Sequence, residues 1–481
     1  MKHFSIIIAA LLFSAGIVRA EVRLPHIFGS GMVLEQQSSI RLHGWSDRPG
    51  GRLRLTASWG EHRTARIADD GSWEIVIETP AASFEPQTLT LDDGSRLRLT
   101  DILIGTVWLC SGQSNMEMPV KGFWGCPVEG ASDVVLAAPN TALRYFKVPR
   151  AAAEEPAGDT RGGAWQSASP RSVAEWSAVG YFFGATLQRT LGIPVGIVDS
   201  SWGGTCIESW IPLSRQQRFT DYDLRAEGTL DLPEGENYSR AASLYDGMIH
   251  PLQGFSFKGV AWYQGCSNTD RPTTYADKLA TLIESWREMF GRKLPFFYVE
   301  IAPYDYGGGE APDSYPGSGA LLREQQQAVM SMVEGTGMVS TNDLVYDWER
   351  GQIHPRRKRE VGERLALWAL REYGYKTHAL GLVFDRAERE GRAMRVYYKN
   401  ADDRLSLEGQ IRGFEVCGTD GRFYKAQARR DDFNSQTLTV WADEVEEPVA
   451  VRYCFRNFSP GNVRDNYGLP ALPFRSDRPQ R

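Results

Sequence analysis

The chain has 481 residues, which is more than one hydrophobic core usually supports, so the sequence predicts two or three domains. It carries 54 Lys and Arg residues against 60 Asp and Glu, a net charge of −6. This balance argues against a nucleic-acid partner. We interpret the one short basic run, at residues 356–359, as a solvated helix face, with a phosphate-binding patch as the alternative.

The first twenty residues have the pattern of a secretory signal peptide, with Lys2, an apolar run from Ile6 to Phe13 and Ala20 before the expected cleavage site. The apolar run is too short to span a bilayer, and no later stretch of twenty apolar residues follows it. We therefore expect a secreted or periplasmic protein without a membrane span.

The remaining chain divides into three segments by pattern. Short alternating runs such as 52–57 and 73–77 predict a β domain over residues 21–103. Over residues 104–375, strand-like apolar runs alternate with helical patterns, which is typical of a parallel α/β sheet. From residue 376 to residue 481 the short alternating runs return, and a second β domain is expected.

The elements predicted in the α/β segment indicate where its ligand site lies. Strands are predicted at 107–110, 194–199, 258–263, 295–301 and 337–341, helices at 177–191, 275–290 and 356–373, and C-terminal strands at 395–398, 413–416, 437–441 and 449–455. Ligand sites in open α/β sheets form beyond the carboxyl ends of the strands. A long Gly- and Pro-rich loop at 307–319 is expected to border such a site.

Three of these strands end in turns that carry a candidate nucleophile or candidate oxyanion donors. The tight turn Gly112–Met116 after the first strand presents Ser114 as a candidate nucleophile, although a turn serine is also common without function. Gly203 and Gly204 follow the second strand, and their backbone N–H groups could hold an oxyanion or simply form a loop. Asn268, after the third strand, offers a side-chain amide for the same oxyanion.

The candidate base is His354, which precedes Pro355 at the predicted start of a helix. Of the seven histidines, only His250 shares the Ile-His-Pro context, and a histidine in such a place is more often structural. We favour His354 because it follows the fifth strand, at the sheet edge where the other turns converge. The cysteines lack zinc-type spacing and no phosphate loop or His-Glu-x-x-His motif occurs, so we expect neither a metal nor another cofactor.

At this point the chain resembles a known superfamily. Ser114, a glycine of the 203–204 pair, Asn268 and His354 match the four namesake positions of the SGNH hydrolases. More narrowly, nearly the whole mature chain resembles the sialate O-acetylesterase family. The segments that carry this resemblance are Leu24–Phe28, Gly112–Met116, Ser200–Thr205, Trp262–Gly265, Leu322–Glu324 and Gly468–Arg475.

The resemblance implies a flavodoxin-like catalytic domain with a parallel sheet, flanked by N- and C-terminal β-sandwich segments. It implies an esterase that removes O-acetyl groups from sialic acids through a Ser114 acyl-enzyme, with His354 as the base and oxyanion donors from Ser114, Gly203 or Gly204 and Asn268. Acetylated plant polysaccharide such as xylan is the alternative substrate. A non-catalytic carbohydrate-binding protein, suggested by fourteen tryptophans, is the alternative from another class.

The family usually has Asp three residues before the histidine, where this chain has Gly351, and Glu where it has Cys266. The third member of a triad is therefore open. Its candidates are Gln352, Asp347 and Glu349. We favour a Ser–His dyad with a neutral acceptor, which predicts a histidine pKa near the unperturbed value of about 6.5.

Two side chains are substrate-binding candidates: Gln113, beside the serine, and Arg323, whose charge would suit a sialic acid carboxylate. An oxidising compartment also permits disulfides. We predict a Cys417–Cys454 bridge between two C-terminal strands, with Cys206–Cys266 as a second candidate pair and buried free thiols as the alternative.

Overall fold

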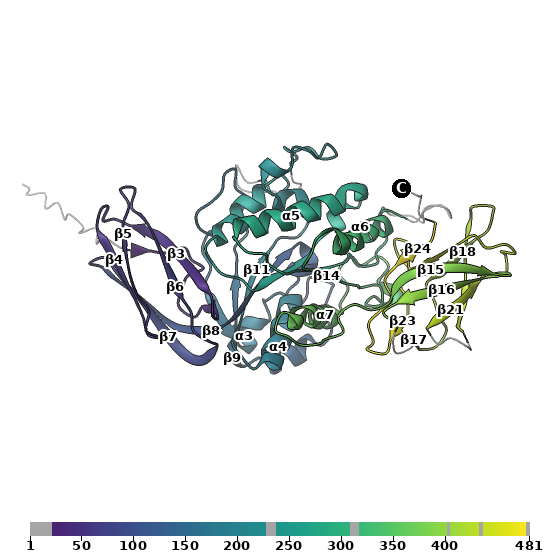
Figure 1. The fold of residues 1–481 in the computed structure, drawn as a ribbon, viewed down its shortest axis with the longest axis horizontal. Helices are drawn as coiled ribbons and strands as arrows, with labels where there is room; N and C mark the ends of the chain where they lie inside the picture. Colours follow the sequence, from purple (N-terminus) through teal and green to yellow (C-terminus); the bar gives the residue numbers. More distant parts are fainter. Residues whose placement is uncertain (1–21, 228–236, 308–316, 402–404, 432–435, 478–481) are drawn as a thin grey trace, which may run out of the picture.

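The computed structural model describes residues 22–227, 237–307, 317–401, 405–431 and 436–477. Three parts follow one another along its longest axis: an N-terminal β part, a central α/β part and a C-terminal β part (Figure 1). The predicted signal peptide lies outside the described residues, as does most of the predicted loop at 307–319.

The central part is built on one sheet, whose strands are β8 (Arg96–Gly112), β9 (Asn140–Lys147), β10 (Trp165–Ala168), β11 (Val195–Ser201), β12 (Gly259–Tyr263), β13 (Phe296–Val299) and β14 (Thr336–Val339). Their order is β10-β9-β11-β8-β12-β13-β14. All neighbours are parallel except β10, which runs antiparallel to β9. The five predicted strands and their parallel pairing are confirmed, whereas β9 and the edge strand β10 were not predicted.

Helices cover both faces of this sheet. They are α1 (Ser114–Glu117), α2 (Ala131–Leu136), α3 (Pro170–Val173), α4 (Ala178–Leu191), α5 (Tyr275–Met289), α6 (Ser318–Met332) and α7 (Lys358–Arg371). Short helical turns occur at η1 (Ile207–Trp210), η2 (Leu213–Arg215), η3 (Tyr245–Ile249), η4 (His250–Leu252), η5 (Cys266–Asn268), η6 (Pro272–Thr274) and η7 (Asp347–Glu349). In Figure 1, α5 and α6 lie on one side of the sheet and α4 and α7 on the other. Within the described ranges, no helix is both long and apolar enough to cross a membrane.

The N-terminal β part contains β1 (Val22–Arg23), β2 (Val33–Glu35), β3 (Ser39–Ser46), β4 (Arg52–Ala57), β5 (His62–Arg66), β6 (Ser72–Glu78) and β7 (Ser83–Asp92). β1, β3 and β6 form one sheet, while β2 and β7 pair with the first half of β8. β8 therefore runs through the predicted domain boundary at residue 103 and joins the N-terminal part to the central sheet. It bends at Asp101, whose φ is +56° and whose carboxylate accepts two hydrogen bonds from Arg144.

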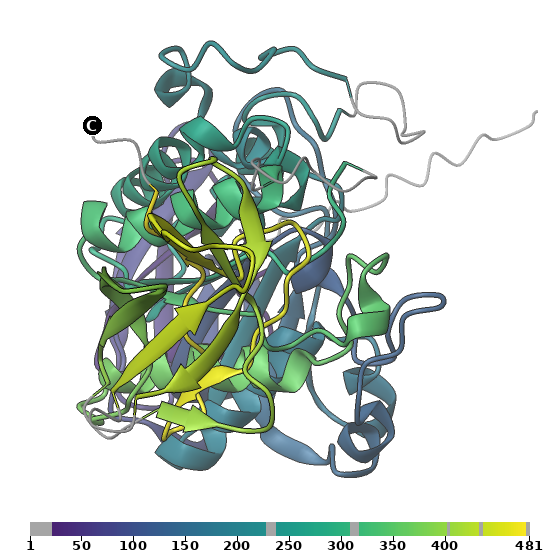
Figure 2. The same cartoon turned by 90° about the vertical axis from the view of Figure 1, so that its right-hand side faces the viewer.

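The C-terminal part contains β15 (Val383–Glu390), β16 (Ala393–Lys399), β17 (Leu405–Leu407), β18 (Phe414–Cys417), β19 (Phe423–Lys425), β20 (Gln427–Arg430), β21 (Thr437–Trp441), β22 (Ala450–Tyr453), β23 (Val463–Asp465) and β24 (Phe474–Arg475). Two four-stranded sheets, β15-β16-β21-β20 and β19-β18-β22-β24, share a core that includes Val396, Val416 and Val451. Figure 2 shows these sheets in front of the central part. The four strands predicted here are confirmed.

The predicted disulfides are wrong, because all six cysteines are free. In the β18–β22 pair, Cys417 lies opposite Ala450, while the backbone N–H of Cys454 donates to Gly413. Four residues along a strand separate the two thiols by roughly 13 Å, whereas the Cα atoms of a disulfide lie within about 7 Å. In the second candidate pair, Cys206 and Cys266 each contact a tyrosine hydroxyl instead.

The end of β8 has no room for a side chain at Gly112. Its φ is +136°, and a Cβ atom there would lie 2.2 Å from the Tyr263 carbonyl oxygen of β12. Gly112→Ala should therefore lower the free energy of unfolding by more than about 4 kcal/mol, since both the backbone conformation and the strand contact must change.

Gly60→Ala is the matched control for this substitution. Gly60 also has a positive φ, +98°, but an added Cβ there would meet no atom within 4 Å. We expect a loss of only about 1–2 kcal/mol at that position. Urea titration of both variants measures the difference, and equal losses would contradict the close approach at Gly112.

Candidate active site

Ser114 lies where the central strand of the sheet ends. The N–H of Gln113 donates to the Tyr263 carbonyl at 3.0 Å, which ties the turn to the end of β12, and Ser114 then begins helix α1. The loops after β11, β12 and β14 leave the same edge of the sheet, since these strands are parallel to β8 or to one another. The Ser114 residue is partly exposed at this edge.

The two glycines after β11 are not equivalent. Gly203 packs directly on the serine, because a Cβ there would lie 3.1 Å from the Ser114 Cβ atom. Its N–H donates to Glu117 Oε2 at 2.8 Å, and Arg150 holds the other oxygen of that carboxylate. Of the two glycines that the sequence offered as donors, Gly203 therefore has its N–H already bonded. The N–H groups of Gly204 and Ser114, in contrast, have no hydrogen bond to any residue in the described part of the chain.

Asn268 is buried and held by its own network. Its Nδ2 donates to Glu208 Oε2 at 2.8 Å, and its Oδ1 accepts from the Ile207 N–H at 3.0 Å. Burial raises the pKa of Glu208, but Arg271 and Lys278 outweigh this effect and leave the pKa below its usual value. An ionised Glu208 fixes the amide orientation and leaves the second Nδ2 hydrogen of Asn268 as a donor.

Gln113 braces the serine turn against the Asn268 turn. Its Oε1 accepts from the Gly265 N–H at 2.8 Å, and its Nε2 donates to Ser267 Oγ at 3.3 Å. Both ends of this buried amide are bonded within the protein, so Gln113 holds the two turns together, and its contact with a substrate stays a prediction.

His354 comes from the loop between η7 and α7, and the residues beside it hold it near the serine turn. Asn115 Nδ2 donates to the Ile353 carbonyl at 3.0 Å, and Asn115 Oδ1 accepts from Lys358 Nζ at 2.5 Å. The neighbour of the serine is thus bonded to the neighbour of the histidine. The sequence did not predict these roles of Asn115 and Lys358, although Asn115 belongs to the serine motif Gly112–Met116.

The Nε2 atom of the His354 ring is unpaired. It is buried and has no hydrogen-bond partner within the described residues, Ser114 Oγ included, so it is free to accept a proton but is not bonded to the serine in this structure. The Phe123 ring packs against it edge-on with centroids 5.2 Å apart. Burial, and then the charge of Lys358, lower the pKa of His354 to about 4, below the value of about 6.5 that sequence reasoning had expected. The imidazole is therefore neutral at pH 7.

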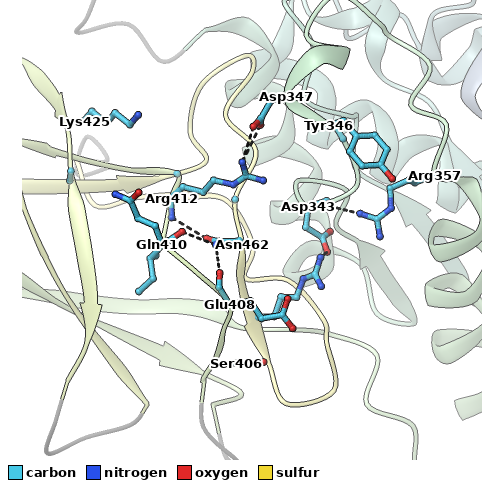
Figure 3. Close-up of a pocket in the computed structure, with 16 residues that line it drawn as sticks. Asp343, Tyr346, Asp347, Arg357, Ser406, Glu408, Gln410, Arg412, Lys425 and Asn462 are labelled. Atoms are coloured by element: carbon cyan, nitrogen blue, oxygen red, sulfur yellow. Dashed lines mark hydrogen bonds and ion pairs between the residues drawn. The ribbon is translucent and has the colours of Figure 1, made fainter.

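None of the three candidates for a third triad member binds the ring in this structure. Gln352 Oε1 accepts from the backbone N–H of His354 at 3.1 Å. The Asp347 side chain is 70% exposed and pairs with Arg412 of the C-terminal part at 3.0 Å (Figure 3). Glu349 is buried and accepts from the backbone N–H groups of its own loop, at 2.9 and 3.3 Å. Among the described residues, no carboxylate is hydrogen-bonded to the His354 ring.

Two cavities flank the histidine loop. One of about 260 Å³ lies beside His354 and is lined by Gly125–Pro127 on one side and by Trp348, Glu349 and Arg356 among others on the other. A larger one of about 650 Å³ lies between the start of this loop and the C-terminal part (Figure 3). Neither Ser114 nor His354 lines the larger cavity, whose walls include the Asp347–Arg412 ion pair.

Arg323 does not belong to the site, contrary to the sequence-based expectation. It lies on α6, is 1% exposed and donates to the backbone carbonyls of Cys454 at 3.4 Å and of Arg456. The guanidinium therefore joins the central part to the C-terminal part and cannot meet a substrate carboxylate.

A serine at a strand end, a neutral histidine held near it, and free N–H groups at the same sheet edge are typical of an ester hydrolase. Comparisons with known proteins also indicate an ester hydrolase. Residues 105–371 match the family described as "Carbohydrate esterase, sialic acid-specific acetylesterase".

Curated relatives cover most of the chain. Human sialate O-acetylesterase is 30% identical over 94% of this chain and 92% of its own length, and the mouse enzyme is 31% identical over 76% and 75%. A crystal structure of a carbohydrate acetylesterase from Xanthomonas citri is 33% identical, with a TM-score of 0.84, and the match covers 95% of this chain and all of that one. The chain therefore belongs to the sialic acid-specific acetylesterase family and is a carbohydrate O-acetylesterase.

The contacts of Asp347 lead to a first kinetic prediction. Asp347→Asn should lower kcat/KM by less than about tenfold, because its carboxylate pairs with Arg412 rather than with the His354 ring. Neutralising a true triad aspartate lowers kcat about 10⁴-fold. Steady-state kinetics on p-nitrophenyl acetate measure the change. A thousandfold loss in a folded Asp347→Asn protein would contradict the dyad and identify Asp347 as the third member of a triad.

The lowered histidine pKa predicts an unusual pH profile. The base form of His354 persists until the pH falls through about 4. The decrease in kcat/KM on the acidic side of the pH profile, its acidic limb, should therefore have its midpoint near pH 4 rather than near 6.5. Lys358→Met removes one of the two causes, so the midpoint of this limb should move upward. Arg359→Met, an exposed change on the same helix, should leave the midpoint in place. An unmoved limb in Lys358→Met would contradict the coupling.

Proposed function

We propose that this protein hydrolyses O-acetyl esters of sialic acids, with Ser114 as the nucleophile and His354 as the base. The observation that carries the proposal is the buried and unpartnered Nε2 of a neutral His354, held near the serine turn by the Asn115–Ile353 hydrogen bond. The similarity to human and mouse sialate O-acetylesterases supports the choice of substrate.

In the proposed reaction, Ser114 Oγ attacks the acetyl carbonyl carbon while His354 Nε2 takes the hydroxyl proton. The resulting tetrahedral intermediate breaks its bond to the sugar oxygen, and His354 returns the proton to that oxygen. Water, deprotonated by the same histidine, then attacks the acetyl-serine. Collapse of the second intermediate releases acetate and restores Ser114.

The negative oxygen of both intermediates needs donors that are not already bonded. The N–H groups of Ser114 and Gly204 and the second amide hydrogen of Asn268 meet this condition, whereas Gly203 allows close packing on the serine. Removing one such donor costs about 2.7–4 kcal/mol of transition-state stabilisation in a related class of hydrolase. We therefore assign the oxyanion role to Ser114, Gly204 and Asn268.

We further propose that the central domain has the flavodoxin-like fold of the SGNH hydrolases. Counting β8, β11, β12, β13 and β14 as strands 1 to 5, the sheet order is 2-1-3-4-5, as in that fold. We propose β-sandwich domains on either side, near residues 21–103 and 376–481. The composition of residues 1–20 supports secretion or a periplasmic location.

An acetylated plant polysaccharide such as xylan is the second candidate substrate. The similarity to a bacterial carbohydrate acetylesterase supports action on an acetylated sugar, and its description does not name the sugar. Acetate release from O-acetylated sialic acid, compared with release from acetylated xylan, separates the two. A higher kcat/KM on xylan would overturn the sialate proposal and leave the esterase chemistry intact.

The same assay tests the catalytic pair. Ser114→Ala and His354→Ala should each abolish acetate release, since one removes the nucleophile and the other its base. His250→Ala is the matched control, because His250 Nδ1 lies 2.8 Å from the Ala157 carbonyl oxygen in a structural contact. Activity within tenfold of the wild type in Ser114→Ala, or a reversal of the two histidine results, would refute the assignment.

A further inference from the structure

The basic run at residues 356–359 is not a continuous charged surface. Arg357 pairs with Glu360 on its own helix, Lys358 is 1% exposed, and the exposed Arg359 stacks over a phenylalanine of α4. Of the four side chains, only Arg356 lines the cavity beside His354. The phosphate-binding patch considered for this sequence is therefore absent, and Arg356 has a separate position.

The Arg356 guanidinium is held by an aromatic support. It lies 4.3 Å from the Trp348 ring centroid, and Trp348 stacks on Tyr346 with centroids 5.4 Å apart and planes 6° from parallel. Arg356 Nε is 3.4 Å from Glu349 Oε1, and the side chain remains 32% exposed. Its two terminal nitrogens have no hydrogen bond to any residue of the described chain. The guanidinium thus presents two terminal nitrogens whose N–H groups are free to donate.

The chemistry of the reaction indicates which part of the substrate lies here. The acetyl oxygen must face the Gly204 and Asn268 donors, while the sugar oxygen must face His354, which returns its proton. The body of the sugar therefore lies on the His354 side of Ser114. The cavity of about 260 Å³ is lined by His354 and Arg356 but not by Ser114, and its volume is nearer to that of one sugar ring than to that of a chain.

We propose that Arg356, supported by Trp348, binds the carboxylate of an acidic sugar and so favours acetylated sialic acids over neutral acetylated sugars. The planar fork of an arginine matches a carboxylate with two parallel hydrogen bonds. The buried Glu349 behind it offsets part of the local positive charge, which favours a singly charged carboxylate over a phosphate dianion. The inference rests on the sialate esterase function proposed above.

Binding to an inactive enzyme tests the inference without turnover. In Ser114→Ala protein, isothermal titration with N-acetylneuraminic acid and with its methyl ester compares the same sugar with and without the charge. The acid should bind roughly 10- to 100-fold more tightly than the ester, as expected for a charge-assisted bond to arginine. No detectable binding of the acid, or equal binding of both, would overturn the inference.

Second substitutions in the Ser114→Ala background assign the effect to one residue. Arg356→Gln should remove the preference for the acid, and Arg356→Lys should retain only part of it, since lysine keeps the charge but lacks the fork. Arg359→Gln is the matched control, because it makes the same charge change on an exposed side chain outside the cavity. A preference that survives Arg356→Gln would show that another group binds the carboxylate.

Kinetics of the active enzyme separate this inference from the proposed function. If the function and the inference both hold, Arg356→Gln raises KM for O-acetylated sialic acid roughly tenfold or more and lowers kcat/KM for p-nitrophenyl acetate by a much smaller factor. An unchanged KM with wild-type turnover of the sialate ester would refute the role of Arg356 alone. A wild-type enzyme that does not hydrolyse the sialate ester would refute the proposed function instead. An equal loss on both esters would indicate a structural role for Arg356.

Discussion

The site depends on one buried contact, the side chain of Asn115. Its amide bonds the Ile353 carbonyl on one side and accepts from Lys358 on the other, so the serine turn and the histidine loop are held as one unit. These segments lie more than 230 positions apart in the chain, and no strand pairing joins them directly. Burying a lysine is costly unless its donors are satisfied, which makes this arrangement specific.

The same burial sets the electrostatics of the reaction. Lys358 has its own pKa lowered to about 7 by burial, and it disfavours a second positive charge on His354. With no carboxylate on the imidazole, the histidine stays neutral over most of the pH range and is a weaker base than a triad histidine. Preorganised donors at Gly204 and Asn268 then have to stabilise a larger share of the developing charge.

Sequence reasoning succeeded where a local pattern carries the information. Five apolar runs became β8 and β11 to β14, because a strand buried on both faces is mostly apolar. It failed at β9, whose residues before Leu143 are polar or small, and at α6, where Arg323 is buried against the C-terminal part. The Cys417–Cys454 bridge failed on strand register, which a single sequence does not reveal.

The sequence by itself determined the class of site: a serine, two glycines, an amide and a histidine at strand ends, whose chemical types and order suffice to predict acyl transfer. Tertiary structure decided which of these groups is free to act. Whether the N–H of Gly203 or that of Gly204 is unbonded, and which arginine faces the cavity, depends on contacts between residues far apart in the chain. Such contacts follow from packing, and local sequence patterns do not encode packing.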